Sequence, residues 1–215
     1  MKTKLSEEER SQLDGLVSET EKQTGTQIVL AVIKRSDSYT ELPWKAFALG
    51  AGIAGLLILI LELSFFDWYP DMMMAVAVTG TLAGGVVFAF LTALLPGFAR
   101  MFLSEDRAET EVLQYGQSLF LERELFATSK RTGILLLVSL FERKVVVLPD
   151  KGVRDKLTET ELQNVIGSMT PLLKKHRLLS AFQAGLKELS RGLGKAATGS
   201  DENELPDDII EEKGV

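Results

Sequence analysis

The sequence contains no cysteine and a single histidine, His176, among its 215 residues. Without cysteine, disulfide bonds, zinc–thiolate sites and thiol catalysis are excluded, and one histidine excludes a metal site built from several. The sequence also lacks a phosphate-binding loop, a dinucleotide-binding glycine pattern and a nucleophile elbow. Because no apolar run follows the first lysines in MKTKLSEEERSQ, a cleaved signal peptide is not expected.

Lysine and arginine are missing from one long stretch of the chain. All 24 lie at or before Lys45 or at or after Arg100, so positions 46–99 contain none. The only acids there are Glu62, Asp67 and Asp71. Such a gap predicts a membrane insert between two polar segments. Outside it, cations and acids nearly balance, which argues against a basic surface for nucleic acid, so no nucleic-acid partner is expected.

Two apolar segments predict membrane-spanning helices at about 44–63 and 72–95, which together form a hairpin over 44–95. The second has no charged residue. At about 1.5 Å per residue it is long enough to cross roughly 30 Å of hydrocarbon. The connection contains Phe65, Phe66, Trp68 and Tyr69, as is typical of a membrane–water interface. The alternative is a buried hairpin in a soluble core.

The distribution of cations predicts the orientation of this hairpin. The loop over 64–71 has no lysine or arginine, whereas the outer flanks carry several. The positive-inside rule therefore predicts a multi-pass protein of the inner cell membrane, in the lipid bilayer, with both termini cytoplasmic. Gly80 and Gly84 form a small-xxx-small step. We expect this step to pack against the first helix, with a helix of a membrane-protein partner or a second copy as the alternative.

The polar segments predict a single α/β domain. Capping boxes at Ser6–Glu9 and Thr158–Glu161 mark two helix starts. The predicted strands are 26–33, 133–140 and 144–148, and further helices are predicted over 104–127 and 178–193. Residues 1–43 are too few to bury a core alone, so we expect them to pack with 104–194 as one cytoplasmic domain. The acidic segment 195–215 is predicted to be a flexible tail.

Two long segments resemble the TPM domain family. They are LSEEERSQLDGLVSETEKQTGTQIVLAVI, near the amino terminus, and RTGILLLVSLFERKVVVLPDKGVRDKL, with the helices that follow. The resemblance covers about 5–40 and 105–194, and NELPD near the carboxyl terminus resembles the ending of a membrane-hairpin subgroup. It implies a small α/β/α sandwich with a mixed sheet, interrupted here by the two-helix transmembrane hairpin. In the family, weak acid-phosphatase activity, divalent-cation binding and the upkeep of membrane complexes have been proposed.

Three acidic residues are candidate ligands for Ca²⁺ or Mg²⁺: Glu142, Asp150 and Asp155. Arg143 is the candidate anion clamp beside them. The alternative for each is a solvated or turn-forming residue in a strand connection. The favoured function is a binding or accessory module that serves the upkeep of a membrane complex. A membrane-bound, metal-assisted acid phosphatase built on these residues is the alternative.

A basic run follows the predicted helix that starts at Thr158. It reads Lys174-Lys175-His176-Arg177. On a membrane-tethered domain these cations could face anionic lipid headgroups, and a solvated helix end is the alternative.

Overall fold

The computed structural model describes residues 5–64, 70–194 and 209–214. The chain divides into two compact units. The sheet domain comprises residues 1–37 and 108–215, and the hairpin unit comprises residues 38–107. One domain is thus assembled from two segments that the hairpin unit separates in sequence.

The sheet domain is built on four described strands, β1 (Gln27–Arg35), β2 (Gly133–Ser139), β3 (Lys144–Pro149) and β4 (Ile210–Gly214). Their order across the sheet is β3-β2-β1-β4. β1 runs parallel to β2 and to β4, whereas β2 and β3 form an antiparallel hairpin. The mixed sheet and the β2–β3 hairpin confirm the sequence-based predictions. Buried apolar runs form these strands because both faces of the sheet are covered.

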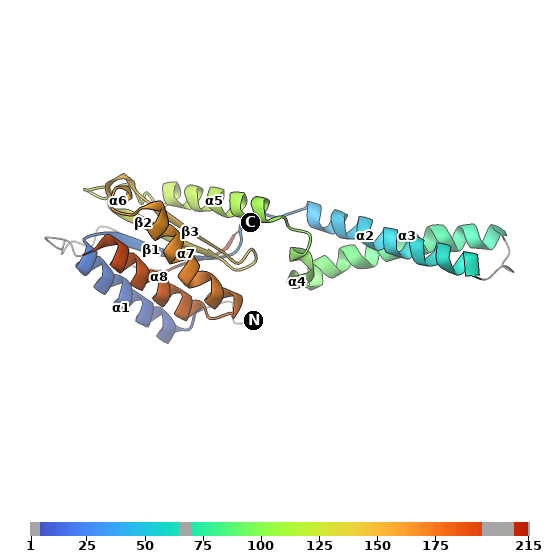
Figure 1. Cartoon of the computed structure of the whole chain (residues 1–215), viewed down its shortest axis with the longest axis horizontal. Coiled ribbons are helices and arrows are strands. Elements are labelled where there is room, and N and C mark those ends of the chain that lie inside the picture. The colour runs from blue at the N-terminus through green and yellow to red at the C-terminus, as the bar shows by residue number, and fades with distance from the viewer. Residues whose placement is uncertain (1–4, 65–69, 195–208, 215) are drawn as a thin grey trace. The chain divides into compact units, whose positions relative to one another are not determined.

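Helices cover both faces of this sheet and make the predicted α/β/α sandwich (Figure 1). One face carries α1 (Glu7–Thr24), α7 (Glu159–Lys174) and α8 (Leu178–Leu193). The other carries α5 (Glu105–Glu122). Alternate strand residues divide between two apolar clusters, as the two-residue period of a strand requires. For example, Leu30 and Leu136 pack toward α8, whereas Ala31 and Leu137 pack toward α5.

Both predicted capping boxes are present. The Ser6 hydroxyl accepts a hydrogen bond from the Glu9 N–H (3.2 Å), and the Glu9 carboxylate accepts one from the Ser6 N–H (2.8 Å). Thr158 and Glu161 repeat the arrangement at α7. These reciprocal bonds satisfy amide groups that a helix start otherwise leaves without partners. α5 ends at Glu122, five residues before its predicted end, and a turn with Glu124 at φ 51° follows.

The prediction of a flexible tail over 195–215 is wrong for its last described part. Residues 210–214 form β4, with Ile210 paired to Ala31 of β1. Glu211 binds Arg10 on the α1 side (2.8 Å), and Glu212 binds Arg123 on the α5 side (2.7 Å). The acids that suggested a solvated tail are held by cations far away in sequence. Residues 195–208, including NELPD, lie outside the described residues.

The hairpin unit contains α2 (Glu41–Ser64), α3 (Pro70–Leu94) and the short α4 (Pro96–Arg100). α2 and α3 are long and apolar enough to cross a membrane. Only 11% and 6% of their apolar windows are buried, so within this chain they are not the core of a soluble fold. The predicted aromatic cluster Phe65, Phe66, Trp68 and Tyr69 lies outside the described residues. α4 was not predicted, and it starts where Pro96 occupies the first helical turn.

Candidate functional site

The structure does not bring the three predicted metal ligands together. Glu142 lies in the β2–β3 turn before β3, and Asp150 follows the last residue of that strand. At about 3.4 Å per residue, the length of β3 keeps them roughly 20 Å apart. Asp155 is the C-cap of α6 (Lys151–Arg154) and stays at the Asp150 end. In the part of the chain that the structure describes, no three acidic or histidine side chains are placed to hold a metal ion. The predicted three-carboxylate site is therefore wrong.

Glu142 is the centre of a buried hydrogen-bond network. Its Oε1 accepts hydrogen bonds from the N–H of Ser36 (3.0 Å) and from the Ser36 hydroxyl (2.7 Å). Its Oε2 accepts a hydrogen bond from the Ser139 hydroxyl. The three residues join the end of β1, the end of β2 and the turn after β2. A buried carboxylate with these donors stabilises the sheet and has little capacity left for a cation.

Arg143 follows Glu142 in the same turn. Its φ of 56° lies in the left-handed region, which is uncommon outside glycine. Its Nε is buried and has no hydrogen-bond partner among the described residues. Nearby, the Arg35 guanidinium lies 4.6 Å from the centre of the Phe141 ring. This end of the sheet carries the arginine side chains of Arg35 and Arg143. The anion clamp at Arg143 stays a prediction.

Asp150 is held by a different set of partners. Arg131 donates two hydrogen bonds to its carboxylate, at 2.7 and 2.9 Å, and the Lys151 N–H donates a third at 2.7 Å. Burial raises the pKa of Asp150, but these bonds outweigh burial and hold the pKa below its usual value. An ionised carboxylate that caps α6 and binds an arginine bidentately is explained by structure alone.

Asp150 also lines a cavity of about 300 Å³ between α5 and β3. The cavity is lined by Gln117, Phe120, Leu121, Leu148, Pro149, Asp150 and Arg154. It is mainly apolar with a charged end. No sequence motif indicated it, because its lining comes from α5 and from the end of β3, more than twenty residues apart.

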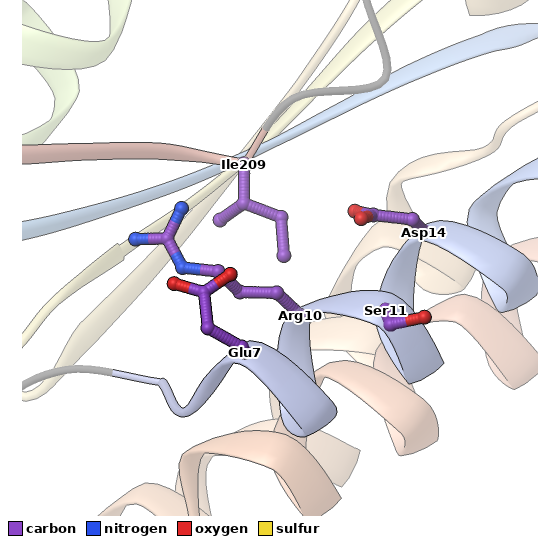
Figure 2. A pocket seen from close by; sticks show the side chains of 5 residues that line it. All are labelled: Glu7, Arg10, Ser11, Asp14 and Ile209. Atoms are coloured by element: carbon purple, nitrogen blue, oxygen red, sulfur yellow. The ribbon is translucent and has the colours of Figure 1, made fainter.

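A second, smaller hollow of about 190 Å³ lies between α1 and the residue that precedes β4 (Figure 2). Figure 2 shows four of its lining side chains on α1, namely Glu7, Arg10, Ser11 and Asp14, and one, Ile209, immediately before β4. Arg10 is bound to Glu211. Sequence reasoning missed this hollow because it placed residue 209 in a flexible tail.

Comparison with known proteins shows which family this fold resembles. Residues 100–192 match the family model of the TPM domain. The chain contains a TPM domain. The solved structures include one similar fold, the NMR structure of the BA42 protein from the psychrophilic bacterium Bizionia argentinensis sp. nov.. It is 14% identical, with a TM-score of 0.57 over 96% of this chain and 94% of that chain. No curated protein matches the sequence.

The match confirms the family predicted from the sequence, and the membrane-hairpin subgroup stays a prediction. The family model begins at residue 100, so the first strand and helix of the TPM domain lie outside the matched range. In the structure, β1 is nevertheless the central partner of both β2 and β4. The earlier segment therefore completes the sheet domain whose later residues match the family model.

Outside the TPM domain, the two predicted packing glycines contact α2. A Cβ on Gly84 would lie 2.5 Å from the Ala54 Cβ and 3.0 Å from the Gly50 oxygen. A Cβ on Gly80 would lie 2.7 Å from the Ile58 side chain. The glycines thus allow α2 and α3 to approach closely within the hairpin, as small residues do between membrane helices.

Proposed function

We propose that this chain is an integral membrane protein whose α2–α3 hairpin spans the inner cell membrane. The hairpin holds the TPM domain at the cytoplasmic face, where it acts as a binding or accessory module in the upkeep of a membrane complex. The observation that carries this proposal is the exposure of apolar side chains along both helices. Leu57 and Val86, for example, are 56% and 59% exposed. Apolar surface of this extent is stable in lipid and unfavourable in water.

The base of the hairpin supports the same proposal. Trp44 is 73% exposed at the start of α2, and its ring makes an edge contact with Phe47. Lys45 donates a hydrogen bond to the Phe102 carbonyl oxygen at 3.2 Å, and Phe98 contacts both Phe88 and Phe102. Aromatic rings beside a lysine are typical of the boundary between hydrocarbon and headgroups.

Membrane integration and orientation are testable on a chain that has no native cysteine. The full-length protein should stay in the membrane pellet after alkaline carbonate extraction, and release into the supernatant would contradict the proposal. A membrane-impermeant maleimide should label Glu62→Cys in intact cells. It should label Lys22→Cys, in the TPM domain, only after permeabilisation. Labelling of Lys22→Cys in intact cells would overturn the cytoplasmic placement.

A binding role is favoured over catalysis because the candidate catalytic carboxylates are engaged in structural bonds. Glu142 binds two serines, and Asp150 binds Arg131. A hydrolase needs a nucleophile or an activated water beside a positioned base. Because the carboxylates of Glu142 and Asp150 are both engaged in these bonds, neither is free to act as the catalytic base.

The alternative, a metal-assisted acid phosphatase, makes a distinct prediction. Full-length protein would release phosphate from a generic ester in the presence of Ca²⁺ or Mg²⁺. Glu142→Gln and Asp150→Asn would each abolish that activity, whereas Glu8→Gln, at an exposed helix start, would not. We expect no metal-dependent release above that of a mock preparation. Release that disappears in both site variants would replace the binding-module proposal.

A further inference from the structure

Five exposed cations lie at one end of the TPM domain, although they come from three distant parts of the sequence. They are Lys34 at the end of β1, Lys213 at the end of β4, and Lys174, Lys175 and Arg177 between α7 and α8. None of the five forms an ion pair within the described residues. The chain as a whole has a net charge of −6, so this end differs in sign from the average of the molecule.

The topology of the domain explains why these cations share one end. β1 and β4 are parallel, so their carboxyl ends lie side by side. α1 is connected to β1 through Gly25 and lies antiparallel to that strand, so α1 starts at the end of the sheet where β1 stops. α8 lies beside α1 in the same direction, since Ser190 binds Gln23 near the ends of both helices (Figure 1). α8 therefore starts, and α7 ends, at the end of the sheet where β1 stops.

The turn between α7 and α8 presents its cations to solvent. His176 has a φ of 58°, and the N–H groups of His176 and Arg177 donate to the oxygens of Leu173 (2.9 Å) and Leu172 (3.0 Å). These bonds close α7 in the manner of a left-handed C-cap. As a result, the four side chains from Lys174 to Arg177 are all exposed, between the buried Leu173 and the half-buried Leu178.

Acidic groups at the same end are largely occupied. Glu211 binds Arg10, and Glu142 accepts bonds from two serines. Glu109 binds Lys144 at 3.5 Å. Glu7 and Glu8 remain exposed in the first turn of α1, where their negative charges interact favourably with the positive end of the helix dipole. The five cations thus outnumber the exposed acids that have no partner in the described structure.

The covalent connections to the hairpin unit leave the domain at this same end. The chain departs after Asp37, two residues beyond the end of β1. It returns through α5, whose early residue Glu109 contacts Lys144 at the start of β3. We propose that this basic end of the TPM domain binds anionic lipid headgroups of the membrane in which the hairpin lies. The inference rests on the proposed membrane integration and adds a lipid-binding surface to it.

The test uses the full-length protein in nanodiscs, with one fluorophore on Gln183→Cys in the second turn of α8. Spin-labelled lipid headgroups quench the fluorophore when the basic end approaches the bilayer. Discs of phosphatidylcholine alone are compared with discs that also contain phosphatidylglycerol. We expect about twofold stronger quenching with the anionic lipid, and a decrease at high salt, because surface attraction is screened.

A matched pair of variants separates this patch from net charge. Lys174→Gln, Lys175→Gln and Arg177→Gln together should reduce quenching in anionic discs to the level in neutral discs. Lys22→Gln, Lys130→Gln and Lys151→Gln remove the same charge from exposed positions at the opposite end of the sheet, and should retain the wild-type quenching. Equal loss in both triple variants, or no effect of phosphatidylglycerol, would overturn the inference.

Resistance to carbonate extraction is measured on the same preparations. If the protein is extracted, the proposed function itself fails. If the protein is integrated but its quenching does not change with anionic lipid, only the proposed lipid-binding surface is wrong. An acidic protein partner then becomes the better explanation of the basic patch.

Discussion

Glu142 accepts two hydrogen bonds from Ser36, a residue 106 positions earlier in the chain. The hairpin unit lies between the two in sequence. The contact therefore joins the two segments of the TPM domain at the point where the first segment ends. A carboxylate that sequence reasoning assigned to a metal site instead holds a divided domain together.

Replacement of Glu142 should destabilise the TPM domain. In Glu142→Ala the buried Ser36 and Ser139 groups lose their shared acceptor, and we expect a loss of about 2–4 kcal/mol in the free energy of unfolding. Urea unfolding of the full chain in detergent measures it. Glu8→Gln, on an exposed helix start, is the control and should change stability by less than about 0.5 kcal/mol. A loss no larger than that of the control would show that the network is dispensable.

The stability conferred by Glu212 should depend on pH. The pKa of Glu212 is lowered, first by the hydrogen bond from the Tyr115 hydroxyl at 2.7 Å and also by Arg123, while burial opposes the shift. Because the pKa is lower in the folded state, this contribution is complete above the unfolded-state pKa of about 4.3. It is lost as the pH falls through the folded-state pKa.

Glu212→Gln should therefore cost about 1 kcal/mol at neutral pH and nothing once the wild-type carboxylate is protonated. Chemical unfolding of both proteins across the acidic range measures the difference. Glu122→Gln, an exposed acid in the last turn of α5, serves as the control. A cost that stayed constant with pH would mean that Glu212 contributes through packing.

Loss of Arg131 should raise the pKa of Asp150. In Arg131→Gln, burial of the Asp150 carboxylate, which is 5% exposed, is no longer offset by two charge-assisted bonds. We expect an upward shift in an NMR titration of the carboxyl carbon and a loss of about 2 kcal/mol near neutral pH. Lys130→Gln, the neighbouring exposed cation, should leave the titration unchanged. An unchanged Asp150 titration in Arg131→Gln would contradict the assigned pairing.

Packing of the hairpin should depend on which glycine is replaced. Gly84→Ala places a methyl group 2.5 Å from the Ala54 Cβ, whereas a Cβ on Gly52 meets nothing within 4 Å. Overpacking of this kind typically costs about 1–3 kcal/mol. We expect Gly84→Ala to unfold at lower SDS concentration than wild type, and Gly52→Ala to match wild type. Equal behaviour of the two variants would indicate that α2 and α3 do not pack closely in detergent.

The signals that predicted secondary structure correctly are local. Ser6 and Glu9 are three residues apart, and so are Thr158 and Glu161, so each capping box is specified by one turn of chain. The apolar runs of β2 and β3 are separated by a short turn, which leaves few alternatives to an antiparallel hairpin. The uncharged length of α2 and α3 is likewise a property of contiguous residues.

The failures involve partners that are remote in sequence. Glu211 and Glu212 suggested a solvated tail, and only folding brings Arg10 and Arg123 to opposite faces of β4. Glu142 and Asp150 are only eight positions apart in the sequence, but the extended strand between them places them at opposite ends of the sheet. The sequence shows which residues are charged, but it does not show which of those charges are paired in the folded protein.

The sequence by itself determined the elements, the α/β class and the apolar hairpin, because caps, periodicity and uninterrupted hydrophobicity act within a few turns of chain. The tertiary structure alone decided which carboxylates are bound and that residues 210–214 complete the sheet. It also decided that Lys34, Lys174 and Lys213 share one end of the domain. Those outcomes depend on strand direction and register, which bring distant residues together and which no local pattern encodes.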